Sequence, residues 1–294
     1  MKKVILITGC STGFGRLAAE TLGKEGHTVY ASMRNTGSKN ASVKGELLDF
    51  AKKENLSIQV LDLDVTKDSS VDQAVKTIVD KEGRIDVLIN NAGVMYVGVT
   101  ESFTLEQIQH QFDTNFFGVV RLNRAVLPHM REKKDGLLIH LSSIAGRIVL
   151  PFFGVYNASK YALEALAESY RYELSQLGID SVIVEPGPFH TNIINASPSG
   201  SDQERISKYG ALAERPSNML SAFNDFFASE NTTNPQEVVA VISKLIAAKP
   251  GERPLRTVVG PDYGVVKINE FGEGLQPGLM EGIGMSDLMK LAVD

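Results

Sequence analysis

The sequence predicts an α/β fold in which a parallel β-sheet carries helices on both faces. Short apolar runs rich in β-branched residues, typical of buried strands, alternate with segments that have apolar residues at helical spacing. Repeated strand–helix–strand units of this kind form parallel sheets with right-handed crossovers. Three helical segments end at a glycine, Gly26, Gly83 or Gly178, and glycine commonly closes a helix.

The predicted strands and helices follow one another in a regular order. The first strand, VILIT at 4–8, and the second, TVYAS at 28–32, enclose the amphipathic segment GRLAAETLGKEG at 15–26. The later strands are separated by helical segments in the same way. The further predicted strands are 58–64, 86–90, 137–142, 181–186 and 256–260, and the further predicted helices are 68–83, 104–130, 156–178 and 235–249.

One segment interrupts this alternation. Residues 188–234, polar and then aromatic, lie between the sixth strand and the helix 235–249. A long excursion inside a compact domain is usually a lid or a binding loop, so we interpret it as a substrate flap. The sequence therefore predicts a single domain. Residues 1–260 form its dinucleotide-binding and catalytic part, including the flap 188–234, and residues 261–294 form a C-terminal extension.

The composition is that of an ordinary soluble enzyme. The 294 residues are 43% hydrophobic and 22% charged, with a formal net charge of −5, and no run of lysine and arginine suggests a nucleic-acid partner. Cys10 is the only cysteine, so no intramolecular disulfide can form and a reducing compartment fits. No stretch approaches the ~20 apolar residues of a membrane span. We therefore expect a cytoplasmic protein.

A glycine-rich turn, TGCSTGFG at 8–15, joins the first predicted strand to the first helix. Glycines at 9, 13 and 15 permit a sharp turn and close approach of a ligand, and the helix start offers free N–H groups to a pyrophosphate. The spacing alone is a weak signal, and a plain tight turn is the alternative. The strand–turn–helix context favours dinucleotide binding in a doubly wound, Rossmann-type sheet. No Lys-Ser/Thr follows the last glycine, which excludes a P-loop.

Candidate catalytic residues follow the fifth predicted strand. Tyr156 and Lys160 are four residues apart on one helix face, where an ammonium is expected to lower the pKa of a phenol. A phenol so acidified can donate a proton to a carbonyl that is reduced by hydride. A second such pair, Tyr263 and Lys267, makes the spacing alone a weak signal. Ser143, at the carboxyl end of a strand, favours the first pair, because open α/β sheets bind ligands there; Tyr263 is expected to be structural.

Other chemistries are disfavoured by the sequence. The five histidines form no HExxH motif and have no close Cys/His spacing, so no metal site is predicted. Ser143 lacks the G-x-S-x-G surroundings of a hydrolase nucleophile. His140 alternates within a strand, and we expect a hydrogen-bonded core or helix-facing residue.

Together, the motifs resemble the classical short-chain dehydrogenase/reductase family. The resemblance covers roughly residues 4–260 and implies a sheet of seven strands. The start TGCS, GPFHT at 187–191 and the long C-terminal extension are similar to the hydroxysteroid and retinol dehydrogenase branch. The ordered motifs are TGCSTGFG, NNAG at 90–93, Asn115, Ser143, Tyr156-x-x-x-Lys160, and Pro186-Gly187 followed by Thr191.

The resemblance implies a role for each of four catalytic residues. Tyr156 donates the proton, and Ser143 hydrogen-bonds the carbonyl oxygen. Lys160 holds the nicotinamide ribose and acidifies Tyr156, while Asn115 kinks its helix and positions water in a proton relay. A cofactor-binding sensor or scaffold of the same fold is the alternative to an enzyme. Such a protein could keep the glycines while losing Tyr156 or Lys160, and both are present.

The resemblance also implies a dinucleotide site along the carboxyl ends of the strands. Asp64 and Val65 meet the adenine, Asn91 to Gly93 meet its ribose side, and Thr191 with the Pro186 loop binds the nicotinamide amide. The cofactor-binding residues expected on this basis are Gly9, Ser11, Thr12, Gly13, Phe14, Gly15, Arg34, Asp64, Val65, Asn91, Ala92, Gly93, Tyr156, Lys160, Pro186, Gly187 and Thr191.

Arg34 indicates which dinucleotide is used. In dinucleotide folds an acid about 20 residues beyond the glycine turn binds the ribose hydroxyls, and its charge repels a 2′-phosphate. The resemblance places that acid at Met33, beside Arg34, whose guanidinium can bind a phosphate. Ser11 and Thr12 could add hydroxyl donors, although many NADP-preferring relatives carry a basic residue at position 12. We therefore expect NADP(H); a solvated arginine at a strand end is the alternative.

The expected reaction is hydride transfer between NADP(H) and a carbonyl/alcohol pair, most plausibly reduction of an apolar ketone, steroid or retinoid-like compound. Helices 104–130 and 156–178 carry enough apolar residues to bury more than one face, which predicts a homo-oligomer. Aromatic and methionine residues near the expected pocket mouth predict a large apolar substrate, although each could instead pack the flap on the body. They are Met95, Tyr96, Phe152, Phe153, Phe189, Tyr209, Met219, Phe223, Phe226 and Phe227.

Overall fold

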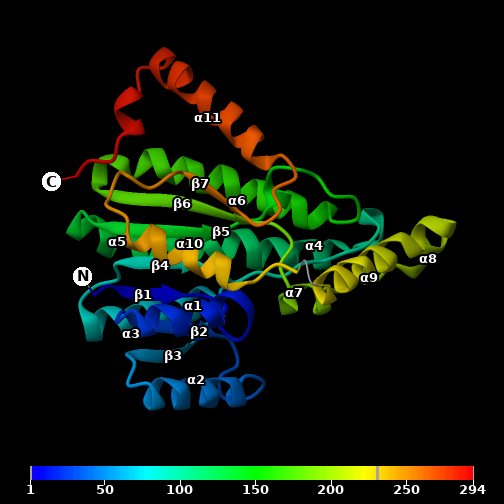
Figure 1. Cartoon of the computed structure of the whole chain (residues 1–294), viewed down its shortest axis with the longest axis horizontal. Helices are drawn as coiled ribbons and strands as arrows, with labels where there is room; N and C mark the ends of the chain where they lie inside the picture. The colour runs from blue at the N-terminus through cyan, green and yellow to red at the C-terminus, as the bar shows by residue number, and fades with distance from the viewer. Residues whose placement is uncertain (1, 230–231, 294) are drawn as a thin grey trace.

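The predicted α/β fold is confirmed by a computed structural model, which describes residues 2–229 and 232–293 (Figure 1). Within these residues seven parallel strands form one sheet in the order β3-β2-β1-β4-β5-β6-β7. The order reverses between β1 and β4, and a ligand crevice is expected at such a switch point. The strands are β1 Val4–Ile7, β2 Thr28–Met33, β3 Ile58–Asp62, β4 Val87–Asn90, β5 Gly136–Leu141, β6 Ile179–Pro186 and β7 Arg256–Val259.

Helices cover both faces of the sheet, as the strand–helix alternation predicts. Ile5 and Ile7 of β1 belong to the core beneath α1, α2 and α10, whereas Leu6 points to the opposite core beneath α3 and α5, because side chains alternate along a strand. The helices are α1 Gly13–Lys24, α2 Ala41–Lys53, α3 Asp68–Glu82, α4 Leu105–Phe112, α5 Gly118–Lys133, α6 Gly154–Glu173, α7 Asn192–Asn195, α8 Gln203–Ser207, α9 Arg215–Ala228, α10 Gln236–Ala247 and α11 Val265–Gly282.

The central strands are buried over their whole length. Every residue of β1, β2, β4, β5 and β6 is buried, while the edge strands β3 and β7 are partly exposed. Burial on both faces explains why these strands are continuous apolar runs in the sequence rather than alternating ones. Among the described residues, none of the helices combines the length and apolar character needed to cross a bilayer.

Three helical regions differ from the sequence-based expectation. The segment expected as one helix over 104–130 is divided into α4 and α5 by a π turn, Asp113–Phe117. Neither α2 nor α11 was predicted. In α11, four glycines and Pro277 lower the helix propensity, so contacts with the rest of the molecule must hold it.

The predicted flap is a helical segment rather than an open loop. It contains α7, α8 and α9, which project together from the body in Figure 1. Residues 230 and 231 of the predicted flap, and residues 1 and 294 of the predicted domain, lie outside the described residues.

Candidate active site

A cavity of about 920 Å³ runs along the carboxyl ends of the strands, at the switch point of the sheet. It extends from the glycine turn and the end of β2 to the loops after β4, β5 and β6 and to the flap. All but two of the residues expected at the site from the sequence line this cavity. The exceptions, Gly15 and Asn115, lie behind its wall.

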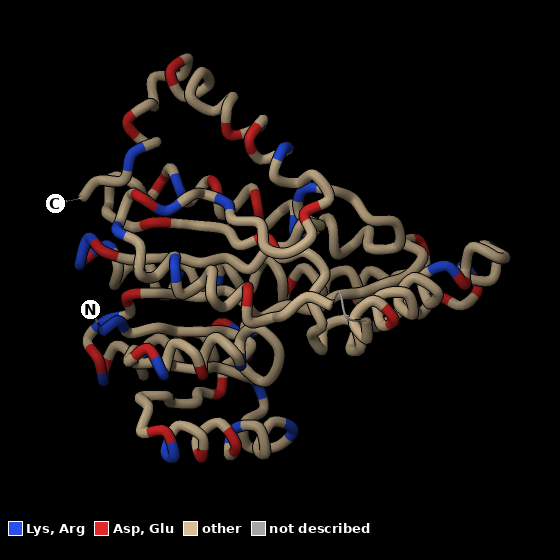
Figure 2. Tube along the Cα trace, viewed as in Figure 1, with Lys and Arg blue, Asp and Glu red and all other residues tan. Residues whose placement is uncertain are grey.

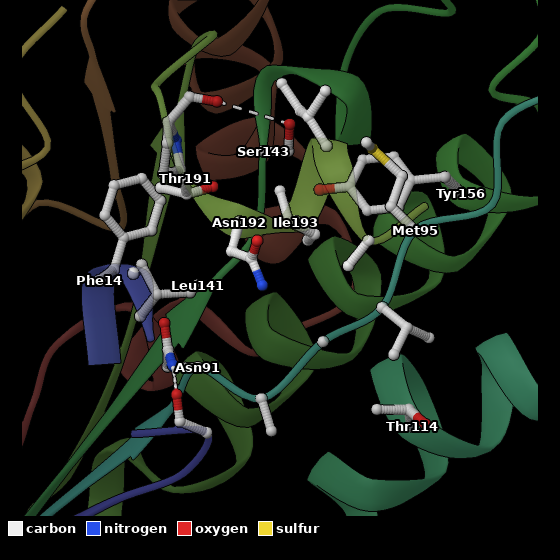
Figure 3. A pocket seen from close by; sticks show the side chains of 18 of the residues that line it. Phe14, Asn91, Met95, Thr114, Leu141, Ser143, Tyr156, Thr191, Asn192 and Ile193 are labelled. Atoms are coloured by element: carbon white, nitrogen blue, oxygen red, sulfur yellow. Dashed lines mark hydrogen bonds between the residues drawn. The ribbon is translucent and has the colours of Figure 1, made fainter. Parts of the chain in front are cut away.

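The glycine turn is packed against the NNAG segment. The Asn91 side chain donates hydrogen bonds to the carbonyl oxygens of Thr8 (2.7 Å) and Gly9 (3.2 Å). A dashed line in the lower part of Figure 3 marks one hydrogen bond of Asn91. A Cβ at Gly15 would lie 2.5 Å from the Gly9 oxygen, and a Cβ at Gly9 would lie 2.9 Å from the Ala92 Cα atom. These glycines therefore allow two backbones to meet, which is a structural need separate from ligand binding.

The start of α1 is suited to a pyrophosphate. Thr12, the residue before α1, makes no capping hydrogen bond with its side chain. The first N–H groups of the helix are thus not satisfied by that side chain and can face a phosphate. Gly13 has φ +58, and a Cβ there would lie 3.5 Å from Thr191 across the cavity. The residues present therefore fit a dinucleotide.

Ser143, Tyr156 and Lys160 meet at the inner part of the cavity. Figure 3 shows the Tyr156 hydroxyl directed toward Ser143. The Ser143 Oγ atom accepts a hydrogen bond from the Ala145 N–H at 3.1 Å. The Lys160 ammonium donates to the carbonyl oxygen of Leu141 at 2.6 Å and lies 5.7 Å from the centroid of the Tyr156 ring. The three side chains expected to perform acid catalysis are thus brought together by β5 and α6.

The expected acidification of Tyr156 is not found. Burial raises the pKa of Tyr156 to about 12, and the hydrogen bond with Ser143 opposes this rise only in part. Burial also lowers the pKa of Lys160 to about 8, partly offset by the negative charge of Glu164. Because desolvation dominates both groups, Tyr156 keeps its proton at neutral pH. The sequence spacing correctly placed the pair but could not reveal its burial.

Asn115 connects the catalytic helix to the NNAG loop. Its Oδ1 atom accepts from the Val94 N–H at 2.8 Å, and its Nδ2 atom donates to the Val94 carbonyl (2.9 Å) and to Ser159 Oγ (3.1 Å). Ser159 in turn donates to the Tyr156 carbonyl at 2.8 Å. Asn115 lies in the π turn Asp113–Phe117, a local distortion often seen at functional sites. Its side chain thus positions the turn of α6 that carries Tyr156.

The far part of the cavity is apolar. Met95, Phe153 and Tyr156 form a cluster with residues of the flap. Of the ten aromatic and methionine residues expected at the mouth, Met95, Tyr96, Phe153, Phe189 and Phe223 line the cavity. The other five, Phe152, Tyr209, Met219, Phe226 and Phe227, do not. Wall residues not identified from the sequence are Ile148, Leu150, Ile193, Ile194 and Pro198.

The opposite end of the cavity is cationic. Arg34 lines it together with Lys39, a cation that the sequence analysis did not identify, and Asn40. The Asn40 side chain donates to the Arg34 carbonyl oxygen at 2.7 Å, which orders the loop after β2. The neighbouring carboxylate of Asp62 accepts from the Thr36 N–H (2.9 Å) and hydroxyl (2.8 Å). The Asp62 carboxylate is therefore engaged by the loop after β2, and Asp62 does not line the cavity.

The structure also places two further residues that were considered in the sequence, Tyr263 and His140. Tyr263, expected to be structural, also lines the cavity and is 67% exposed. His140 is fully buried, and its Nδ1 atom lies 3.3 Å from Asn90 Nδ2, but its Nε2 atom has no hydrogen-bond partner among the described residues. Burial, assisted by the charge of Lys160, lowers the pKa of His140 to about 3. His140 is therefore the core residue that was expected, with a partner for one of its two ring nitrogens among the described residues.

Comparison with known proteins agrees with this geometry. The 3-ketodihydrosphingosine reductase of Bacteroides thetaiotaomicron is 37% identical over 262 residues, which cover 88% of this chain and 88% of the relative. Human retinol dehydrogenase 8 is 38% identical over 259 residues, 84% of this chain and 78% of the relative.

A solved structure and a family model extend the comparison. A short-chain dehydrogenase from Streptomyces avermitilis is similar with a TM-score of 0.75 and 30% identity, over 98% of both chains. ElxO with NADP bound is similar with a TM-score of 0.71 and 25% identity, over 91% of this chain and 100% of that one. The family model for short chain dehydrogenases matches residues 3–202. The chain therefore belongs to the short-chain dehydrogenase family of oxidoreductases.

Proposed function

We propose that this protein is an NADP(H)-dependent carbonyl reductase that acts on a large apolar ketone and can also oxidise the corresponding alcohol. One observation carries the proposal: Ser143, Tyr156 and Lys160 face a single cavity that is apolar at one end and cationic at the other. The apolar end fits the substrate, and the cationic end fits a phosphorylated adenosine.

The chemistry assigns a separate task to each side chain. A bound nicotinamide supplies or accepts the hydride. In reduction, Tyr156 transfers its phenolic proton to the carbonyl oxygen, and Ser143 donates a hydrogen bond to the same oxygen. The Tyr156 phenolate that results lies beside the Lys160 ammonium, whose charge stabilises it. Proton donation suits a phenol with a pKa of about 12, because that phenol is fully protonated at neutral pH.

The shape of the cavity and the names of the relatives support an apolar substrate. The wall near Tyr156 is built from aliphatic and aromatic side chains of the body and the flap. A 3-ketodihydrosphingosine reductase and a retinol dehydrogenase are among the similar proteins, and both names denote apolar compounds. We infer a ketone on a long hydrocarbon or polyisoprenoid-like body, with residues 188–234 acting as its flap.

Homo-oligomeric assembly and a cytoplasmic location stay predictions. Four apolar residues in the segments expected to pair, 104–130 and 156–178, are exposed, and this supports assembly through those segments. They are Leu105, Phe117, Tyr161 and Leu177.

The decisive test compares two tyrosines that line the same cavity. Tyr156→Phe removes the proposed proton donor but keeps the ring, so ketone reduction should fall by roughly 10²–10⁴-fold while dinucleotide binding persists. Tyr263→Phe is the matched control and should keep its activity. Substrates should include long-chain ketones, steroids, retinoids and sugars, followed by cofactor absorbance. Near wild-type turnover by Tyr156→Phe, or a preference for small sugars, would overturn the proposal.

A further inference from the structure

Helix α11 buries Val265, Asn269 and Met280 against the protein, so its inner side is mixed, and it leaves a row of apolar side chains exposed to solvent. Asn269 and the half-buried Glu273 and Gln276 turn toward the body, while Phe271 and Leu275 are exposed. A surface helix normally buries its apolar stripe. The orientation of α11 therefore needs a cause on its inner side and a partner on its outer side.

A buried polar cluster fixes the inner side of α11. The Asn269 side chain donates to Glu185 Oε2 at 2.6 Å and accepts from Arg147 Nε at 2.8 Å. Glu273 forms an ion pair of 3.5 Å with Arg256, whose side chain is 3% exposed. Arg256 also pairs with Glu164 at 2.9 Å and with Glu168 at 2.5 Å, so Glu273 adds one contact to a network. If the helix turned, the buried Asn269 side chain would lose both of its partners, which is unfavourable. The helix is thus held in this rotation and cannot turn its apolar side inward.

The outer side of α11 carries a continuous apolar stripe. Phe271 is 73% exposed, Leu275 61% and Leu279 57%, at the three- and four-residue spacing that places them on one face. The next segment of the chain continues the patch. Figure 1 shows α11 leaning away from the body, outside β7 and α6. The further exposed apolar residues of this region are Val266, Ile268, Ile283, Met285, Met289 and Val293. Exposed apolar residues gathered in one region often mark an interaction site.

We propose that the outer face of α11 pairs with the α11 of a second copy of this chain, in an antiparallel, two-fold arrangement. In such a pair the same patch is used twice. If the two-fold axis passes at Leu275, the two Leu275 side chains face each other, and Phe271 of each copy lies beside Leu279 of the other. The only lysine of α11, Lys267, then lies near Glu281 of the second copy, so the charges at the two ends are complementary.

Two features favour a second copy over a lipid surface. Helices that lie on membranes are rich in lysine and arginine, which attract anionic lipids. Helix α11 carries one lysine against Glu270, Glu273 and Glu281, as the predominance of red along it in Figure 2 shows. In addition, apart from adjacent residues and the backbone of the helix itself, no atom of the described residues lies within 4 Å of the position a Cβ would take at Gly274 or Gly278. Small exposed residues permit close approach of a second helix.

Assembly in solution tests the proposal. Leu275→Glu places two carboxylates against each other at the centre of the pair, so the mass from light scattering at micromolar concentration should fall to half that of the wild type. Leu48→Glu, on α2 and 38% exposed, is the matched control and should leave the mass unchanged. A strictly monomeric wild type would overturn the proposal. An unchanged mass for Leu275→Glu would also overturn it. If either of these results is accompanied by binding of α11 to phosphatidylserine vesicles, the outer face of α11 is assigned to a membrane.

Cross-linking tests the geometry independently. The native Cys10 is buried, and burial raises the pKa of its thiol to about 12, so it should not react. With diamide as oxidant, Leu275→Cys should form a disulfide-linked dimer within minutes. Leu212→Cys, 52% exposed and in the flap, should not. A mixture of Lys267→Cys and Glu281→Cys chains should cross-link faster than either variant alone. Equal cross-linking of Leu275→Cys and Leu212→Cys would show random collision and overturn the antiparallel pair.

Discussion

Replacing Arg34 by alanine should selectively impair the use of NADPH. Arg34 directly follows β2 at the cationic part of the cavity, and the neighbouring Asp62 is engaged by Thr36. A guanidinium–phosphate hydrogen bond contributes about 1.5–3 kcal/mol, which corresponds to roughly 10–150-fold in kcat/KM. Arg34 is exposed, so solvent screening should place the loss toward the lower end of this range.

Lys39 should add a smaller contribution at the same site. Its side chain is exposed and acts as a point charge, for which about 0.2–1 kcal/mol, or roughly 1.5–5-fold, is expected. The assay is kcat/KM for NADPH and NADH with one saturating ketone, at low and at high salt. Lys53→Ala removes the same charge at the end of α2, outside the cavity lining, and should change neither value. Equal losses for NADPH and NADH in Arg34→Ala, or a wild type that prefers NADH, would refute the assignment of a 2′-phosphate site.

Three further predictions follow from burial and packing. The pKa of Lys160 is lowered to about 8, so its ammonium loses its charge as the pH rises through about 8, and kcat/KM for ketone reduction should decline over that range. A pH profile of kcat/KM that stays flat to pH 10 would contradict the role of the Lys160 charge. His140 has a pKa of about 3 when folded and an ordinary value of 6.5, so its contribution to stability is complete above pH 6.5 and is lost as the pH falls toward 3. His140→Gln should therefore reduce the slope of unfolding free energy in this range by up to about 1.4 kcal/mol per pH unit, and an unchanged slope in urea titrations would exclude this residue as its source. Gly15→Ala should lower the melting temperature and abolish dinucleotide binding, because its Cβ would press on the Gly9 carbonyl. Gly45→Ala, which has open space around it in α2, should stabilise the protein by about 0.5–1 kcal/mol. Similar effects of the two substitutions would show that packing at the turn is unimportant.

The sequence predicted the catalytic side of the molecule well because its signals are local. Strands buried on both faces appear as apolar runs, and functional residues stand where those runs end, as Ser143 does after β5. The spacing of Tyr156 and Lys160 correctly placed both on α6 and in one cavity. The pKa values of the pair depend on burial by distant parts of the chain, which no spacing reveals.

The elements that were missed depend on contacts distant in sequence. Helix α2 has only two buried residues, Leu47 and Ala51, so its apolar periodicity is weak. The walls of the cavity formed by Ile193 and Ile194 belong to a four-residue helix whose position is set by the fold of the flap. Lys39 could have been noticed as a second cation close to Arg34, but only the loop ordered by Asn40 brings it to the cavity.

Helix α11 also forms part of the support of the nicotinamide side of the cavity. Glu185, which Asn269 holds at 2.6 Å, directly precedes Pro186 and Gly187, and both of these line the cavity. A Cβ at Gly187 would collide with the carbonyl oxygen of Pro261, in the loop that leads to α11. The same loop supplies Tyr263 to the cavity wall. The cluster beneath α11 and the loop after β6 share these contacts. A partner that binds α11 from outside would therefore also restrain the loop expected to bind the nicotinamide amide. Assembly and cofactor binding should then strengthen each other.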